Sequence, residues 1–337
     1  MSIFTKIDKA LVGMLNNLVD RWYISEIHKS ADNFYYMTDP SEKVILAMAE
    51  KAPEWIPHIK AKHSDKLTDD VKRSIVLNNP NSIRYFSDDT KLTSYVLKNY
   101  SEEMSEEVKL SLVAKNASYI GDIKNPSDKT QVIAVLKDSG CITLIDRPCE
   151  AAQKVSVDKD PFVLSLIEPT ENVCIYAIEK DICNIRFIKC PSEKVQLATV
   201  ERDISALEYI QNPLESVKLA AVKMNPRAIT YIKNPSEDIQ LAAVQQDAKY
   251  LQTIENPSEI VKLAAVSKDG YCIEAINIPS EQIQIAAVKN APLAIMSIEN
   301  PSEAVKHAAE TDNSTVSLES ASKMLLQYAE NVERLSL

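Results

Sequence analysis

The chain has 337 residues, enough for two average domains or one extended repeat array, and 45% of them are apolar. It holds 4 glycines against 16 prolines, whereas average usage would give about two dozen glycines. This scarcity disfavours enzymes built around glycine-rich nucleotide loops. The formal net charge of −10 divides into −3 for residues 1–168 (22 basic, 25 acidic) and −7 for residues 169–337 (16 basic, 23 acidic). That acidic excess disfavours nucleic-acid binding.

The N-terminal segment is predicted to form one amphipathic helix. Its apolar residues recur at intervals of three or four, namely Ile3, Ile7, Leu11, Leu15, Leu18 and Trp22. If the rest of the chain is a repeat array, its last layer would expose an apolar face unless a cap covers it. We therefore predict an N-terminal helical cap over residues 1–38. The alternative is a helix that binds a partner or forms a homo-oligomer.

The N-terminus and the cysteines indicate a compartment. Charged residues interrupt the first nine positions, where a signal peptide needs an apolar core. No stretch approaches the length of an apolar membrane span. The six cysteines form no C-x-x-C pair, so free thiols in a reducing setting are the simplest interpretation. We expect a cytoplasmic protein that does not bind a membrane.

A repeat of 22 residues occupies most of the chain. Seven prolines are spaced 22 residues apart, at positions 169, 191, 213, 235, 257, 279 and 301. Upstream, Pro148 and Pro126 continue the series, and Pro40-Ser-Glu-Lys-Val marks its first clear copy. We count about thirteen units, with degenerate repeats over residues 39–125 and regular repeats over residues 126–322. Residues 323–337 are predicted to form a C-terminal capping helix.

Each unit is predicted to start two helices. The first start follows Asn-Pro-Ser-Glu, as in Asn234 to Glu237, where we expect Asn to be the N-cap and Glu to be N3 of a capping box. The second start, thirteen residues after the first proline, has Asn or Asp as N-cap and often proline as N1, as in Asn225-Pro226. The second helix is only about seven residues long and is expected to be partly 3₁₀.

The apolar pattern predicts the fold. The first helix is apolar nearly all round, as in Val217-Lys-Leu-Ala-Ala-Val222, and the second has two inward residues three apart, such as Ile229 and Ile232. One such unit buries too little apolar surface to be stable, so neighbouring units must pack on one another. The expected fold is all-α, a right-handed α-solenoid (superhelix) with helical caps.

The repeated phrase Asn-Pro-Ser-Glu-x-Val-x-Leu-Ala-Ala-Val, followed by a short second helix, resembles the leucine-rich variant class of solenoid and, more broadly, HEAT-type repeats. It is also similar to tandem repeats of bacteriophage proteins. The resemblance covers roughly residues 40–322. It implies a binding scaffold without catalytic residues or cofactors. For a phage-encoded chain it implies a role in the host cytoplasm, such as binding and inhibiting a host defence protein.

The second helices carry the predicted binding site. The framework repeats closely, while the outward positions of these helices vary from unit to unit. Tyrosine and arginine are enriched at interface hot spots, so we predict that this variable ridge lies on the concave surface and binds a protein. Its residues are Tyr119, Glu208, Tyr209, Arg227, Tyr231, Lys249, Tyr250, Gln252, Tyr271 and Glu274.

Other chemistry has little support in the sequence. His58 and His63 are five residues apart, which does not match the spacing of a helical metal pair, and we expect both to be solvated. Cys174, Cys183 and Cys190 are too widely spaced for a typical metal motif. We predict no catalytic residues and no metal site. Lysines and glutamines alternate along the first helices and are expected to form a solvated convex face: Lys109, Gln131, Gln153, Gln196, Lys218, Gln240, Lys262, Gln284 and Lys306.

The sequence therefore predicts a non-enzymatic scaffold that binds a protein. One alternative is a solenoid that binds nucleic acid or a nucleotide through the same face. Another is a hydrolase with a site in the N-terminal repeats, near His58 and His63.

Overall fold

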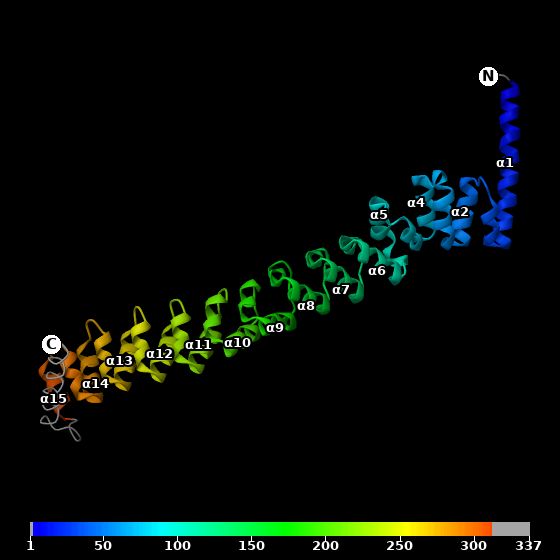
Figure 1. Cartoon of the computed structure of the whole chain (residues 1–337). Coiled ribbons are helices and arrows are strands. Elements are labelled where there is room, and N and C mark those ends of the chain that lie inside the picture. The colour runs from blue at the N-terminus through cyan, green and yellow to red at the C-terminus, as the bar shows by residue number, and fades with distance from the viewer. Residues whose placement is uncertain (1–2, 312–337) are drawn as a thin grey trace, which may run out of the picture. The chain divides into compact units, whose positions relative to one another are not determined.

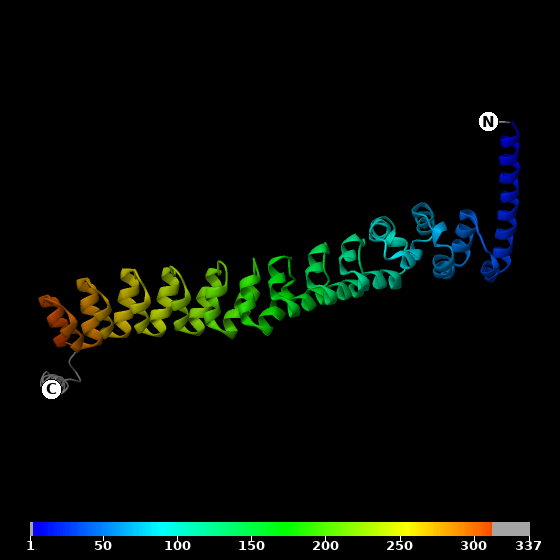
Figure 2. The same cartoon turned by 45° about the horizontal axis from the view of Figure 1, so that its top comes forward.

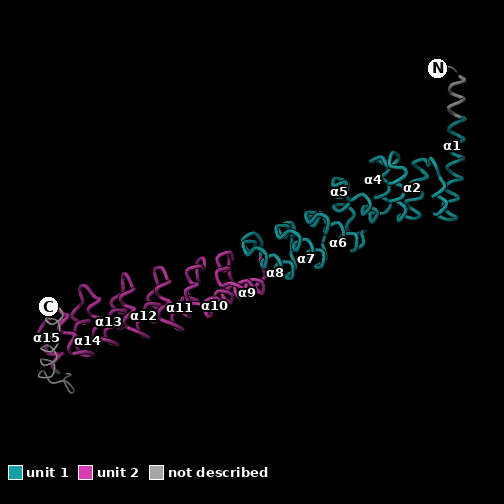
Figure 3. The backbone as a smooth tube through the Cα atoms, in the orientation of Figure 1, with its two compact units in different colours: residues 1–168 teal, residues 169–337 magenta. Residues whose placement is uncertain are grey.

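The computed structural model describes residues 3–311, and every regular element in that range is a helix. The chain divides into two compact units, unit 1 over residues 1–168 and unit 2 over residues 169–337 (Figure 3). The boundary falls within the run predicted as regular repeats. The predicted C-terminal cap at residues 323–337 lies outside the described residues.

Unit 1 begins with a long helix, α1 (Ile3–Lys29), and a short 3₁₀ helix, η1 (Ala31–Tyr36). Helices of both kinds then alternate along the unit: α2 (Glu42–Lys51), η2 (Pro53–Trp55), α3 (Ile56–Lys62), η3 (Ser64–Lys66), α4 (Asp69–Asn78), η4 (Pro80–Phe86), α5 (Thr90–Tyr100), η5 (Ser101–Glu103), α6 (Glu106–Lys115), η6 (Ala117–Asp122), α7 (Asp128–Lys137), η7 (Ser139–Leu144), α8 (Glu150–Lys159) and η8 (Pro161–Ser165).

Unit 2 is more regular than unit 1. Its α helices are ten residues long except for the last, and their 3₁₀ partners each have six residues: α9 (Glu171–Lys180), η9 (Ile182–Phe187), α10 (Glu193–Arg202), η10 (Ile204–Tyr209), α11 (Glu215–Met224), η11 (Pro226–Tyr231), α12 (Glu237–Gln246), η12 (Ala248–Thr253), α13 (Glu259–Lys268), η13 (Gly270–Ala275), α14 (Glu281–Asn290), η14 (Pro292–Ser297) and α15 (Glu303–Thr311).

Consecutive repeats pack side by side within each unit. In unit 2, each α helix contacts the next α helix, and each 3₁₀ helix contacts the next 3₁₀ helix, so that two parallel rows form (Figures 1 and 2). The predicted all-α solenoid of two-helix repeats is thereby confirmed. The second helix of each regular repeat is a full 3₁₀ element. One such element begins at Pro226, as predicted, and others begin at Pro53, Pro80, Pro161 and Pro292.

The core of each repeat comes from a few fixed positions. In α11, Val217, Ala221 and Val222 are fully buried, and the equivalent residues of α12 to α14 are buried as well. In η11, Ile229 is buried. Ile232, the residue that follows the end of η11, is buried as well. Alanine at the second of these α positions lets the backbones of neighbouring helices approach closely, because its side chain ends at Cβ. The inward pair of the short helix holds it against its α partner.

The first helix of each repeat starts differently from the prediction. Ser258, not Asn256, is the N-cap of α13, because its hydroxyl accepts the N–H of Val261. Glu259 is then the first residue of the helix and not N3. The expected capping box is therefore wrong, and the proline precedes the cap. Several asparagines before these prolines instead adopt a left-handed conformation, with φ of 47° to 54°: Asn125, Asn212, Asn234 and Asn300.

Asparagine thus takes the role that glycine has in many turns. Its short polar side chain tolerates positive φ better than most residues do. The following proline has a fixed φ, and serine then caps the helix. No glycine among the described residues has a positive φ. The low glycine content reflects this choice of turn residue.

The second helix starts as predicted. The side chain of Asn225 accepts the N–H of Arg227, and that of Asp247 accepts the N–H of Lys249. The same bond recurs in most described repeats, with the cap residues Asn79, Asn116, Asp138, Asp160, Asp181, Asp203 and Asp269.

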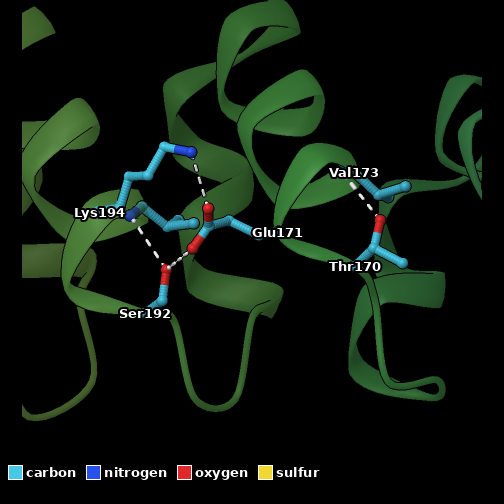
Figure 4. A network of polar contacts seen from close by, with 6 residues as sticks. Thr170, Glu171, Val173, Ser192 and Lys194 are labelled. Carbon is cyan, nitrogen blue, oxygen red and sulfur yellow. Dashed lines mark hydrogen bonds and ion pairs between the residues drawn. The ribbon is translucent and has the colours of Figure 1, made fainter.

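The cap serines also connect neighbouring repeats. The hydroxyl of Ser192 donates to the carboxylate of Glu171, the first residue of the preceding α helix, at 2.7 Å, and Lys194 donates to the same carboxylate at 2.8 Å (Figure 4). These two bonds lower the pKa of Glu171. In unit 2 the serine–glutamate bond recurs in the pairs Ser236–Glu215, Ser258–Glu237, Ser280–Glu259 and Ser302–Glu281.

The glutamines of the predicted polar stripe are not on a solvated face. Gln131, Gln153 and Gln196 are buried, with at most 6% of their surface exposed. The side-chain amide of Gln196 donates to the carbonyl of Pro191, and its oxygen accepts the N–H of Leu214 in the next repeat. Gln131 bridges Pro126 and Cys149 in the same way. The expectation of a solvated face is wrong here because neighbouring loops cover these side chains and use their hydrogen-bonding capacity.

Gly270 marks a close contact between repeats. A Cβ atom at this position would lie 2.4 Å from the carbonyl oxygen of Ala287. We expect Gly270→Ala to destabilise the chain by about 1–3 kcal/mol, because backbone must move to relieve the overlap. Gly13→Ala is the matched control, since nothing lies within 4 Å of its added Cβ. Urea denaturation followed by circular dichroism measures both, and equal stability of the two variants would contradict the close contact.

The cap serine offers a second test. We expect Ser258→Ala to lower the free energy of unfolding by about 1 kcal/mol, because α13 loses its N-cap bond and the repeat loses its bond to Glu237. Ser258→Thr keeps the hydroxyl and should stay close to the original chain, as Thr170 caps α9 in the same position. Denaturation curves of the two variants should separate; if the Ala and Thr variants coincide, the hydroxyl has no such role.

Candidate functional site

The variable ridge of unit 2 is built on the 3₁₀ helices η10 to η13. Each of these helices is fixed at its start by an aspartate or asparagine cap and inside by the buried apolar pair. A 3₁₀ helix has three residues per turn, so the residues between the inward pair face away from the core. Tyr209 is 37% exposed and Tyr271 is 49% exposed, while Tyr231 is half-buried. The buried core and the caps of the repeats, which we call the frame, therefore present aromatic side chains on a row of short, well-anchored helices.

Most of the predicted polar ridge residues are also accessible. Arg227 and Lys249 lie at one exposed position of their 3₁₀ helices, and Glu208, Gln252 and Glu274 lie at another. Lys249 forms an ion pair with Asp247 at 2.5 Å, and this hydrogen bond raises the pKa of the lysine and lowers that of the aspartate. The ridge consequently mixes both signs of charge and is not a basic track for nucleic acid.

Tyr119 does not belong to the exposed ridge. It is 6% exposed and forms part of the core of unit 1. Its place in the repeat is the inward position that Ala206 and Ala228 occupy in unit 2, both of which are fully buried. Tyr250 stands at the same place in η12 but remains half-buried, with Lys249 Nζ 5.4 Å from its ring centre. Sequence variation alone did not separate this inward position from the outward ones.

Arg186 also belongs to the ridge, although it was not among the predicted ridge residues. Arg186 is exposed on η9, and its guanidinium lies 4.9 Å from the centre of the Tyr209 ring on the next 3₁₀ helix. A cation over an aromatic face at this distance is an attractive contact. The 22-residue register places Arg186 in line with Glu208, so the signal was present in the spacing. The ridge therefore extends over η9 to η13.

A cleft adjoins the ridge between η11 and η12. It has a volume of about 500 Å³, and Thr230 and Thr253 of the ridge helices lie on its wall beside Lys233 and Glu255. Gln240 also contributes to the lining. Its side-chain amide donates to Pro235, but its oxygen has no partner among the described residues. In two other repeats the same oxygen accepts an N–H from the next repeat.

His58 and His63 of unit 1 lie in an aromatic cluster, although both were expected to be solvated. His63 is 7% exposed and packs edge-on against Phe34, with ring centres 5.9 Å apart. His58 lies 5.5 Å from Tyr35 and 5.2 Å from Trp55, measured between ring centres. The expectation of solvated side chains is wrong because η1, which lies outside the repeat pattern, packs here.

Of the three cysteines singled out, one is buried and two are at least partly exposed. Cys174 is buried, and burial raises the pKa of its thiol to about 11. Cys190 is exposed and Cys183 is partly exposed. Within the described residues, no group of three or more histidine, cysteine, aspartate or glutamate side chains could hold a metal ion. His307, in the last described helix, is exposed.

Comparisons with protein-family models, with curated proteins and with solved structures gave no match for this chain. None of the helices in residues 3–311 combines the length and the apolar character that a membrane span needs. The description of the site therefore depends on the residues of this chain.

The environment of His58 predicts a pH dependence of stability. Burial, Lys62 and His63 all lower the pKa of His58 below its usual value. The unfolded chain then binds more protons than the folded one near pH 6, so stability should fall as the pH drops below about 6.5. We expect His58→Gln to reduce this loss between pH 7.5 and pH 5.5, as measured by urea denaturation. His28→Gln changes an exposed histidine and serves as the control; an equal effect of both would contradict the assignment.

Proposed function

We propose that this protein is a non-catalytic scaffold that binds a protein partner through the ridge over η9 to η13. The observation that carries the proposal is the exposure of tyrosines on a row of 3₁₀ helices. Capping hydrogen bonds and buried apolar residues already hold these helices in place, and the exposed tyrosines are not needed for that. Tyr209 and Tyr271 in particular lie on the surface although they are large and partly apolar. Tyrosine can bury a large surface in an interface while its hydroxyl forms a hydrogen bond.

The repeat frame explains how the ridge could favour binding. Caps and buried isoleucines fix each 3₁₀ helix before a partner arrives, so little conformational entropy is lost on binding. The exposed charged residues Arg186, Arg227, Glu208 and Glu274 lie on the same row of 3₁₀ helices as the tyrosines, and Arg186 contacts Tyr209. Such a mixture of aromatic anchors and polar neighbours is typical of protein interfaces.

The class of partner to test first is a host protein, since the repeats resemble those of bacteriophage proteins. A host defence component bound and inhibited by this chain would agree with that resemblance. The affinity for such a partner should depend on ridge tyrosines.

The test is affinity capture with the tagged full chain, followed by quantitative mass spectrometry. We expect Tyr209→Ala/Tyr231→Ala/Tyr271→Ala to weaken retention of the main bound protein at least tenfold, because three aromatic anchors are lost. The α helices provide the control, in which three exposed apolar residues, Met224, Ile260 and Leu263, are changed to alanine.

Circular dichroism of both variants separates loss of binding from loss of folding. Retention of the partner by the ridge variant at the level of the control would place the binding surface elsewhere. Retention that depends steeply on salt and is lost after nuclease treatment would instead favour a nucleic-acid ligand.

A further inference from the structure

Helix α1 has an exposed apolar face that the rest of unit 1 does not cover. Seven apolar side chains between residues 11 and 22 are between 47% and 68% exposed: Leu11, Val12, Met14, Leu15, Leu18, Val19 and Trp22. With about 100° between successive residues of an α helix, Leu11, Leu15, Leu18 and Trp22 point within about 60° of one another. Met14, Val12 and Val19 border them. Together the seven residues form one continuous face, which we call the α1 stripe.

The α1 stripe is not an extension of the contact that holds α1 to its own unit. That contact involves the C-terminal part of the helix, where Ile27 is fully buried and Tyr23 and Ile24 pack against the core. Ile24 and Ile27 point to the side of the helix opposite the stripe, and Tyr23 lies at the border between the two sides. Further toward the N-terminus this packing side carries polar residues, such as Asn16 and Asn17, and Lys43 of α2 donates to Asn17.

The helix therefore has two distinct faces, and only one of them packs within the unit. In Figures 1 and 2, α1 continues beyond the helices that it contacts. Contiguous apolar surface of this kind on a well-packed protein marks a site of interaction. A cap for the first repeat would require only the Ile27 side of the helix, so capping does not account for the stripe.

We propose that α1 pairs in an antiparallel orientation with α1 of a second copy of this chain. Six of the seven stripe residues have a counterpart in the stripe when it is reversed about a midpoint between Asn16 and Asn17. A two-fold axis at that midpoint places Leu11 at the level of Trp22 of the other copy, Met14 at the level of Val19, and Leu15 at the level of Leu18. The stripe therefore matches itself, as a surface shared by two identical subunits must.

The charges of α1 agree with a second copy better than with a lipid surface. Between residues 11 and 29 there are two acidic residues, Asp20 and Glu26, and two basic ones, Arg21 and Lys29. Helices that lie on membranes carry an excess of lysine and arginine on their polar face. A balanced charge instead allows two copies to approach without repulsion.

Sedimentation equilibrium of the full chain tests the pairing. We expect a mass of twice 37.6 kDa at micromolar concentrations, and at least a hundredfold weaker association for Leu11→Glu/Leu18→Glu. Asn16→Glu/Asn17→Glu adds the same two charges to the opposite side of the helix and should leave the dimer intact. Because all four residues are exposed, the circular dichroism of both variants should match that of the original chain.

Disulfide trapping tests the orientation. In a chain with Cys190→Ser, which removes the exposed thiol, Leu11→Cys and Trp22→Cys are made separately and mixed under mild oxidation. Antiparallel pairing predicts cross-links between the two variants but not within either one, whereas self-linking of each variant would overturn the proposed orientation. If the original chain stays monomeric over the whole concentration range, the pairing itself is overturned. The same holds if the chain is a monomer that binds neutral or anionic vesicles.

Discussion

The double use of the cap serine is the interaction on which the repeat structure most depends. Its hydroxyl accepts an N–H from its own helix and donates to the glutamate that begins the preceding helix. One side chain thereby fixes where a helix starts and how that helix lies against its neighbour. A 22-residue unit buries too little apolar surface to stand alone, so a bond that couples local and neighbouring structure has more effect here than in a globular domain.

The glutamines and the asparagines complete this coupling. Buried glutamines such as Gln196 link the loop of one repeat to the cap of the next, which explains why polar residues can recur within an otherwise apolar array. Asparagine at positive φ turns the chain between the 3₁₀ helix and the following α helix. Where Leu214 replaces the cap serine, Ser216 reaches Glu193 instead, so the contact between these two repeats survives the substitution. The frame therefore leaves the outward side chains of the 3₁₀ helices free to differ between repeats.

The two surfaces proposed for interaction are built by different parts of the chain. The ridge of unit 2 is a product of the repeat itself, because every repeat contributes the same outward positions and only the residue types change. The α1 stripe arises outside the repeat, from a helix that is longer than its contact with unit 1 requires. A protein partner on the ridge and a second copy on the stripe would use separate sets of residues, in unit 2 and in α1, and each can be removed without changing the buried core of a repeat.

The sequence by itself determined the helical class, the 22-residue register and the start of each second helix, because these depend on local signals such as Asp247 and on the spacing of buried isoleucines. It also located the outward ridge positions of Tyr209 and Tyr271. Only the tertiary structure decided that Tyr119 is buried, that Gln196 is covered by the next loop, and that His58 and His63 lie under η1. It likewise decided that serine, and not asparagine, caps the first helix. These outcomes depend on which neighbour covers a side chain and on the backbone conformation before the proline, and the residue pattern of one repeat does not contain that information.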